Sequence, residues 1–561
     1  MFVPNPRKQM SIYDSIDDMP EYLKEYLLNS WAYVFNKHIF PEINEDRFSV
    51  LYSDKGSRPN SPVNVIIGAL ILKEVFNHTD EQLLGEIYFN ELYQYALRLL
   101  EDKRPPVSIN TFTNFRNRVC DHLEKTGVDL IQQEMESLAD VIAEHFEIED
   151  ENVRIDSFMI SSSCKNMSRL ELIYTVNLGL VKLLCDKSKK SIPEKCKCYL
   201  QEGHKKDTIY RTKDSELETK LEHLLKHSKM LYDAAKNLDK EVTESQEFQS
   251  LKRMLGEQTK DNNDDDHDND NFENVEPKES KNLASDILQN PSDPDATFRF
   301  KYDSNIGYTA NIVEVFDGNN AVLKHYDLQP NIYSDQNFCQ DSIQKLDEDE
   351  NIVSKKENIT SDNNSVSDPD DENLLSNLIN VFVDGTYYTF ELGLKAFEKG
   401  INLIPGELAG KNPSTDKISF SEFKVDANKQ ITECPAGCNP VFSYYHEDNQ
   451  TYTARFSKEI CNNCSKKEAC RVQEIKDSYS IRFNEKEYFY SRLRDKMETK
   501  DYKELTNKRA GIEGIPSVFR RKYNIDSMPV RGKVRSKIWL GFKTGAINVK
   551  RLFSKKQVCG V

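Results

Sequence analysis

The stretch LINVFVDGTYYT occupies residues 378–389 and reads as a buried strand that ends at Asp384 and Gly385. A short apolar run bounded by a turn signal is typical of a strand inside a sheet. A second such run, NVRIDSFMI at 152–160, carries Asp156. In α/β sheets functional groups gather where strands end, so these two aspartates could approach each other. A single strand-end aspartate is more often a turn residue or a helix cap.

Strands and helices alternate around these two runs. Residues 297–303, 308–316 and 321–328 have β-like patterns, and a turn at 317–320 separates the last two. A helix is expected at 391–400, where the pattern ends in glycine, and INLIPG then reads as a short strand. The sequence therefore predicts an α/β fold with a mixed sheet.

The region before the first strand reads as helical from 16 to 130. Apolar residues follow a helical period in 62–76 and 80–100, and a new helix is expected after 108, with Arg116 and Arg118 on it. Several short helices closed by a basic one suit a helix-turn-helix-like DNA-binding module. A plain helical bundle explains the pattern equally well.

Charge is distributed unevenly along the 561 residues, whose net charge is -17. Residues 257–297 hold 13 acids and 3 bases, whereas 471–561 hold 23 Lys and Arg against 10 Asp and Glu. The basic end is long enough to line a phosphate-binding surface, although a solvated Lys-rich face is the alternative. The acidic tract, and the similar one at 340–374, cannot bury a core and should be disordered. Residues 166–255 read as an inserted helical hairpin.

The sequence shows no secretory signal and no membrane-spanning segment. The first 13 residues are polar, and no run approaches the ~18–20 apolar residues of a membrane span. We therefore expect a cytoplasmic protein with reduced cysteines. Five cysteines fall within 37 residues, and four thiolates in a tetrahedron suit structural Zn²⁺. They are Cys434, Cys438, Cys461, Cys464 and Cys470.

A third acid, Glu513, lies in KRAGIEGIPSVFRRKY at 508–523. A helix would put Arg509, Glu513 and Arg520 on one face, although an ordinary surface ion pair is the simpler interpretation. Gly511, Gly514 and Pro516 make a poor ordinary helix, which suggests close packing against a site or a backbone. Three carboxylates could hold two Mg²⁺ ions for phosphodiester cleavage, with the arginines on phosphate oxygens.

These motifs resemble those of bacterial insertion-sequence transposases of the Asp-Asp-Glu class, within the RNase H-fold superfamily. Similar segments are RIDSFMISSS (154–163), FVDGTYYT (382–389) and RAGIEGIPSVFRR (509–521), the last followed by the basic segment 529–552. The superfamily pattern Tyr-x2-Arg-x3-Glu-x6-Lys is met at Arg509 and Glu513, with Arg520 in place of lysine. Thr506 stands where tyrosine is expected, which puts any role of that tyrosine in doubt.

The resemblance implies the following expectations. Asp156, Asp384 and Glu513 are catalytic and bind two Mg²⁺ ions in an RNase H-like core. The family's upstream Cys-Pro-x-Gly favours Cys434, Cys461, Cys464 and Cys470 as zinc ligands, with Cys438 as substitute. Residues expected to bind DNA or phosphate are Arg509, Arg520, Arg116, Arg118, Arg531 and Lys533. The partners are double-stranded DNA, as terminal inverted repeats and as target, and a second copy of the chain in a homodimer on paired ends.

The expected organisation has six parts. They are a helical DNA-binding domain (1–130), a first piece of catalytic core (150–165), a helical hairpin with an acidic insertion (166–296), the continued core with its acidic loop (297–425), a Cys-rich insertion (426–475) and basic catalytic helices (476–561). The expected activity is cutting and rejoining DNA at the ends of the element. The alternatives are a transposase-derived DNA-binding protein that cleaves nothing and a stand-alone nuclease.

Overall fold

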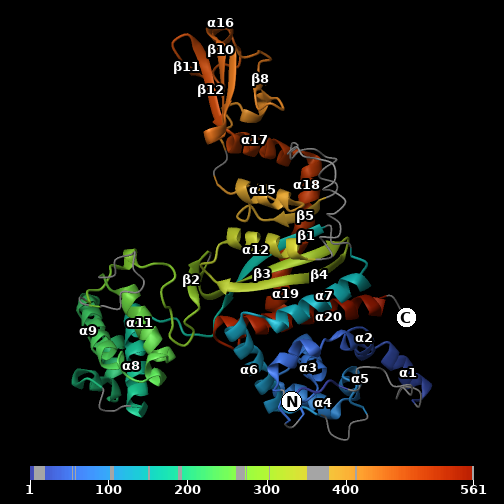
Figure 1. The fold of residues 1–561 in the computed structure, drawn as a ribbon, viewed down its shortest axis with the longest axis vertical. Coiled ribbons are helices and arrows are strands. Elements are labelled where there is room, and N and C mark those ends of the chain that lie inside the picture. Colours follow the sequence, from blue (N-terminus) through green and yellow to red (C-terminus); the bar gives the residue numbers. More distant parts are fainter. Residues whose placement is uncertain are drawn as a thin grey trace.

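The computed structural model describes residues 1–5, 19–53, 55–56, 59–100, 106–148, 152–187, 192–260, 272, 275–301, 303–349, 378–410 and 413–558. A mixed sheet lies at the middle of an elongated molecule (Figure 1). The N-terminal helices lie at one end, and a small β domain lies at the other. The α/β class predicted from the sequence is confirmed.

The central sheet has six strands within the described ranges. Its order is β2-β3-β1-β5-β6, and β4 also pairs with β3. β1 is antiparallel to β3 and parallel to β5, and β5 is parallel to β6. The strands are β1 (Asn152–Ser161), β2 (Thr297–Phe300), β3 (Ser304–Asp317), β4 (Asn320–Pro330), β5 (Ile379–Val383) and β6 (Ile401–Pro405). β3 is buried almost throughout because both of its faces are covered by helices.

Helices cover both faces of this sheet. α7 (Leu130–His145) and α20 (Lys533–Val558) pack against β4 on one side, and α12 (Asp335–Glu348) and α15 (Phe390–Glu398) lie on the other (Figure 1). α19 (Ala510–Tyr523) packs against β1. α20 also contacts the N-terminal helices, so one hydrophobic core runs from those helices through the sheet.

The N-terminal helices surround α3, which is buried on nearly all sides. Its sequence VNVIIGALILKEVF is apolar all round, as a central helix requires. The stretch 80–100 forms two helices, because Asn90 ends one and its side chain caps the next. The helices are α1 (Glu21–Leu28), α2 (Trp31–His38), α3 (Val63–Phe76), α4 (Asp80–Phe89), α5 (Glu91–Ala96) and α6 (Ile109–Thr126).

The insertion between β1 and β2 differs from a hairpin. Three long helices and a short one pack around a separate hydrophobic core: α8 (Arg169–Lys187), α9 (Leu217–Ala235), α10 (Lys240–Thr243) and α11 (Gln246–Gln258). The disorder expected for the acidic tract is wrong for residues 275–296, where Leu288 and Asp293 are fully buried. It is also wrong for 340–348, which belong to α12. Residues 261–271, 273–274 and 350–377 lie outside the described part.

The Cys-rich segment forms a small β domain with a core of its own. It contains a four-stranded sheet of order β11-β12-β10-β9 and the pair β7-β8. The strands are β7 (Lys424–Val425), β8 (Ile431–Glu433), β9 (Phe442–His446), β10 (Thr451–Ser457), β11 (Gln473–Glu474) and β12 (Ser478–Asn484). α16 (Lys458–Asn462) lies beside β10, and α17 (Glu485–Glu498) and α18 (Lys500–Thr506) lead back toward the central sheet (Figure 1).

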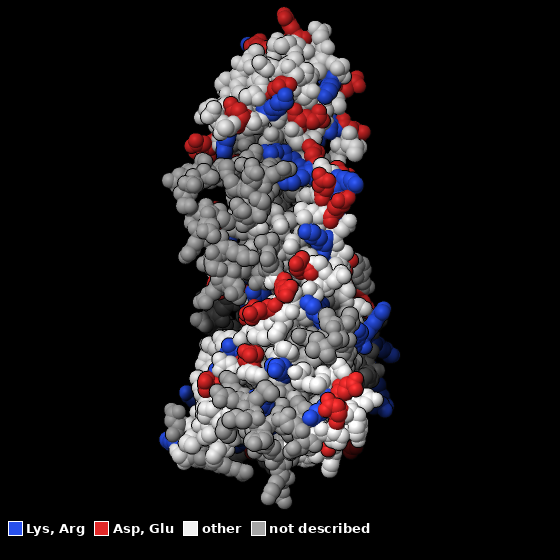
Figure 2. All heavy atoms as spheres, turned by 90° about the vertical axis from the view of Figure 1, so that its right-hand side faces the viewer, with Lys and Arg blue, Asp and Glu red and all other residues white. Residues whose placement is uncertain are grey.

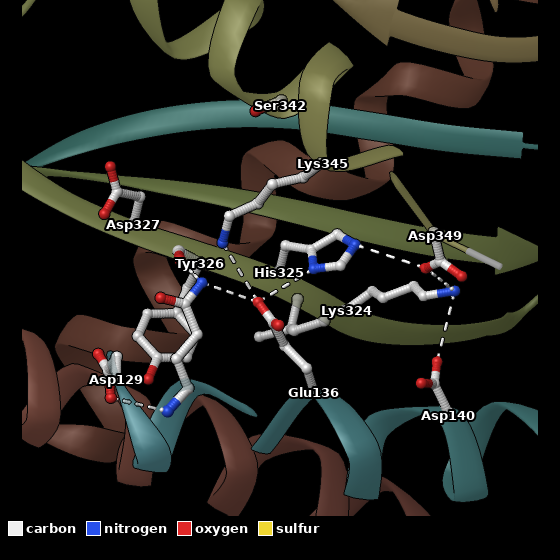
Figure 3. A network of polar contacts seen from close by, with 12 residues as sticks. Asp129, Glu136, Asp140, Lys324, His325, Tyr326, Asp327, Ser342, Lys345 and Asp349 are labelled. Atoms are coloured by element: carbon white, nitrogen blue, oxygen red, sulfur yellow. Dashed lines mark hydrogen bonds and ion pairs between the residues drawn. The ribbon is translucent and has the colours of Figure 1, made fainter. Parts of the chain in front are cut away.

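A buried polar network ties α7 and the end of α12 to β4 (Figure 3). Glu136 on α7 lies 3.1 Å from His325 and 3.3 Å from Lys345, and Asp349 lies 2.8 Å from Lys324. Burial opposes the charge on Glu136, but hydrogen bonding and the charges of His325 and Lys345 outweigh it and lower its pKa to about 2. Polar groups thus fix the position of α7 on the sheet, as packing alone could not.

None of the helices in the described part of the chain combines the length and apolarity that a membrane span needs.

Candidate active site

The strand register brings Asp156 and Asp384 side by side. β1 and β5 are parallel, with Asn152 opposite Asn380 and Arg154 opposite Phe382. The position expected for Asp156 at a strand end is wrong, because it is the fifth of the ten residues of β1 and pairs with Ile312 of β3. Asp384 lies just beyond β5, and continuing the β1–β5 register two residues past its last pair puts it opposite Asp156. Asp384 directly follows β5 because the chain turns there, and its side chain accepts hydrogen bonds from the Gly385 amide at 2.8 Å and the Thr386 hydroxyl at 3.4 Å. Two carboxylates from distant segments therefore share one edge of the sheet.

The environment of Asp156 opposes its negative charge. Burial raises its pKa to about 6, the charge of Asp384 adds to this effect, and Arg509 and the Ser157 amide oppose it. A buried carboxylate beside another acid is a place where a bound cation would be stabilised. The raised pKa means that burial and Asp384 together outweigh the opposing effects of Arg509 and the Ser157 amide.

Glu513 reaches this edge from the first turn of α19. The helix begins after a 3₁₀ turn, η11 (Asn507–Arg509), and continues past Pro516 to Tyr523. Ile512, Ile515 and Phe519 face the core and hold the helix against the sheet. The Glu513 side chain is 62% exposed, and its Oε1 lies 3.0 Å from Arg509 Nη1.

Arg509 joins the helix to the strand. Its other terminal nitrogen, Nη2, lies 4.0 Å from Asp156 Oδ1, and its side chain is only 17% exposed. Its Nε is buried and makes no hydrogen bond with any residue that the structure describes. One guanidinium therefore separates Glu513 from Asp156, and it supplies the positive charge that the acids need.

The three acids do not form a finished ligand shell. Within the described ranges, no three His, Cys, Asp or Glu side chains are gathered closely enough to hold a metal ion. The donor chemistry nevertheless suits Mg²⁺, which prefers hard carboxylate oxygens and retains several waters.

The other basic residues expected to contact phosphate have partners within the protein. Arg520 donates to the Met159 carbonyl at 3.2 Å and lies 3.4 Å from Asp526. Arg116 pairs with Asp80, and Arg118 lies over the Tyr52 ring at 4.9 Å. Arg531 donates to Ser163, and Lys533 donates through Nζ to Gln329 at 2.6 Å.

These contacts bear on the expected phosphate-binding surface. On the face drawn in Figure 2, Lys and Arg are interspersed with Asp and Glu and do not form one continuous basic surface. DNA would therefore have to compete with internal acids for several of the predicted cations. Salt would weaken such binding strongly, because these contacts are electrostatic.

The five clustered cysteines meet at one place in the small β domain. All five line a cavity of about 260 Å³. The Cys434 amide bonds to the Cys438 carbonyl at 2.9 Å, and the Cys464 amide bonds to the Cys461 carbonyl at 3.3 Å. Burial, together with the neighbouring thiols, raises the pKa of Cys461 to about 11. The fold therefore brings the five thiols to one cavity, but their side chains are not close enough together to form a set of metal ligands.

Arg154 and Glu314 at this site were not identified from the sequence. Arg154 contacts the backbone at the start of α19, and Glu314 is fully buried and holds Arg154 from β3. Arg154 stands two residues before Asp156, which puts both on one face of β1. The unusual Gly511 was the only sequence signal for this contact.

Two family models match parts of the chain. Residues 433–553 match a model described as Transposase DDE domain, and residues 24–118 match one described as Transposase domain (DUF772). The first match includes the five cysteines, Arg509, Glu513 and Arg520, and the second includes Arg116 and Arg118. Asp156 and Asp384 lie outside both. No curated protein and no solved structure matches the chain.

Both matched regions are similar to transposase domains, which supports a transposase. The two matches confirm the predicted resemblance to insertion-sequence transposases of the Asp-Asp-Glu class. A DDE domain implies an RNase H-like core.

Proposed function

We propose that this transposase cuts and rejoins DNA at the inverted-repeat ends of an insertion sequence, with Asp156, Asp384 and Glu513 as its catalytic carboxylates. The observation that carries the proposal is the parallel register of β1 and β5, which aligns the two aspartates beneath the helix that bears Glu513. Arg509 supports the assignment of Glu513, because it contacts both Glu513 and Asp156.

The carboxylates would hold two Mg²⁺ ions, which activate the attacking oxygen and stabilise the leaving one when bound. The residues of the chain contribute the rest. Asp156 would serve as a ligand in its carboxylate form, so the fraction protonated near its pKa of about 6 would have to release its proton to water. Arg509 moves from Asp156 to a phosphate oxygen of the DNA, to which a guanidinium can donate two hydrogen bonds. Glu513 is exposed, and its ion pair within the described part of the chain is with Arg509, so it is then free to close the site.

The test is Mg²⁺-dependent nicking of a duplex that contains the element's end. The Asp384→Asn variant keeps the size of the side chain and removes its charge, so nicking should fall by at least about 100-fold. Asp416→Asn is the matched control, because Asp416 lies in a loop and its carboxylate contacts Ser414. Undiminished nicking by Asp384→Asn would overturn the assignment. DNA binding without nicking by the wild type would favour the non-catalytic alternative.

The cysteine cavity is proposed to hold structural Zn²⁺. Cys434, Cys461, Cys464 and Cys470 are assigned as ligands, with Cys438 as the substitute. The support is the convergence of the five thiols on one cavity, because soft thiolates in a small volume select zinc. Metal analysis of the purified chain should give one zinc, lost in Cys461→Ser and retained in Cys438→Ser. A zinc-free wild type with an intact β domain would exclude this site.

A further inference from the structure

The geometry points to Arg154 as a positioning residue that fixes the Glu513 helix over the Asp156 strand, with Gly511 as the position that makes room for it. This inference rests on the proposed function and adds a residue to it that touches neither metal nor DNA. It is carried by contacts that join β1, β3, α19 and α20.

Arg154 reaches from the strand to the helix. Its Nη1 donates to the Lys508 carbonyl at 3.0 Å, at the turn that leads into α19. Its guanidinium carbon lies 4.3 Å from the centre of the Phe316 ring. The side chain thus lies flat on the sheet and ends against the helix backbone.

Gly511 is the point of closest approach. A Cβ at this position would overlap the guanidinium of Arg154, and it would lie 2.6 Å from Nη2. An arginine tip can usually move aside, but this one is held by its bonds to Glu314 and Lys508, so moving it would break them. Glycine is therefore required here for close packing, whereas the neighbouring Gly514 has open space around it.

Glu314 on β3 holds the Arg154 side chain in place. It stands directly opposite Arg154 in the β1–β3 register, and its Oε2 accepts from Arg154 Nε at 2.5 Å. Its other oxygen accepts from Arg551 Nη2 of α20 at 2.7 Å. The carboxylate is fully buried between two arginines, so its orientation is fixed by charge-assisted bonds on both sides.

Two arginines therefore link strand and helix in opposite directions. Arg509 extends from the helix to Asp156, and Arg154 extends from the strand to the helix backbone. The Arg509 link must break for metal to bind, whereas the Arg154 link does not involve an acid of the site. Arg154 can therefore keep the helix that bears Glu513 at a fixed distance from the β1 strand while Arg509 moves from Asp156 to a phosphate oxygen. Contacts that orient a metal-binding residue without touching the metal change metal affinity by about 10–100-fold.

The experiment measures nicking of end-containing DNA across a Mg²⁺ series, together with DNA binding in the absence of divalent ions. In Arg154→Lys, one ammonium cannot span Glu314 and the Lys508 carbonyl. The Mg²⁺ concentration for half-maximal nicking should rise about tenfold, and the maximal rate should fall about 10–100-fold. DNA affinity should stay within about twofold, because Arg154 is turned inward.

Gly511→Ala supplies an independent variant that deletes no polar group. It should show the same loss of Mg²⁺ affinity, and the double variant Arg154→Ala/Gly511→Ala should be no worse than Arg154→Ala, because removing the guanidinium removes the overlap. Arg253→Lys is the matched control. Arg253 is a partly buried arginine on α11 of the helical insertion, and it bonds to the Glu257 carboxylate and the Pro294 carbonyl. It should nick like the wild type.

The outcomes separate the two proposals. If the wild type nicks the DNA and both Arg154→Lys and Gly511→Ala need the same Mg²⁺ concentration as the wild type, the positioning role is overturned. The proposed function is then unaffected. A wild type that binds the DNA and nicks it at no Mg²⁺ concentration overturns the proposed function itself. If the Arg154→Lys variant loses nicking and melts at a lower temperature, but needs the same Mg²⁺ concentration for half-maximal nicking, the role of Arg154 is purely structural. That result overturns the inference.

Discussion

Replacing Lys543 with methionine should destabilise the junction between the N-terminal helices and α20. Lys543 Nζ lies 2.8 Å from Glu74 on α3 and donates to the Tyr523 carbonyl at 2.6 Å, and the two charged side chains are only 5% and 10% exposed. Methionine fills the same space but leaves the buried Glu74 carboxylate with an ion pair to Lys73, at 3.3 Å, in place of two.

The magnitude follows from this geometry. Removing one partner of a buried ion pair costs about 3–5 kcal/mol, and the lower end applies because Lys73 partly compensates Glu74. A loss of about 3 kcal/mol lowers the folding equilibrium constant by about 100-fold. The double variant Glu74→Leu/Lys543→Met leaves no unpaired charge, so its stability should return close to that of the wild type.

Tryptophan fluorescence during urea unfolding is a suitable assay. The chain has two tryptophans, and both report on this junction. Trp539 lies under Lys543 at 4.7 Å, and Trp31 packs against Phe76 of α3 and Phe553 of α20. The control is Lys503→Met, which breaks an exposed pair with Glu498 and should change stability by less than about 1 kcal/mol. The reasoning is refuted if Lys543→Met behaves like this control, or if the double variant is as unstable as Lys543→Met.

Three further outcomes are expected. Because the pKa of Asp156 is raised to about 6, the proton that must leave for metal binding is retained below that pH. The Mg²⁺ concentration for half-maximal nicking should then rise about tenfold per pH unit below 6, and a flat profile would contradict this. Glu136 has its pKa lowered to about 2 from an ordinary 4.5, so it contributes stability above pH 4.5 that is lost as the pH falls toward 2. In urea unfolding, the free energies of unfolding of the wild type and of Glu136→Gln should differ by about 3 kcal/mol at pH 7 and become nearly equal near pH 2. Gly307→Ala should not fold to a stable protein, because its Cβ would lie 2.7 Å from the Ser162 amide nitrogen; circular dichroism with an unchanged melting temperature would count against this.

Much of the candidate site could be predicted because its signals are local. Asp384 follows a buried apolar run, and the end of such a strand can be predicted from the sequence. The strand that carries Asp156 was also predicted, but the expected position of Asp156 at its end was wrong, because β1 continues to Ser161. The spacing of Arg509 and Glu513 is one helical turn, and the structure places them 3.0 Å apart. The clustered cysteines were likewise visible as a spacing, and they do line one cavity.

The errors arose where burial depended on distant partners. The acidic composition of 257–297 predicted disorder, yet Asp293 is buried because it accepts hydrogen bonds from Tyr308 and from the Gly532 amide. The insertion was expected to be a hairpin because only one leucine stripe was recognised. The core that joins α8, α9 and α11 arises from three segments whose apolar faces are complementary only when folded.

The sequence by itself determined the local elements: one strand that carries Asp156, one that ends at Asp384, a segment with arginine and glutamate one helical turn apart, and a Cys-rich segment. Hydrophobic period and capping act over a few residues, so they can be read without the fold. Only the tertiary structure decided the register that aligns Asp156 with Asp384, the arginine that lies between Asp156 and Glu513, and the contact of Arg154 with the backbone above it. These depend on which strands pair and how closely a helix packs, and those choices are made by the burial of the whole core.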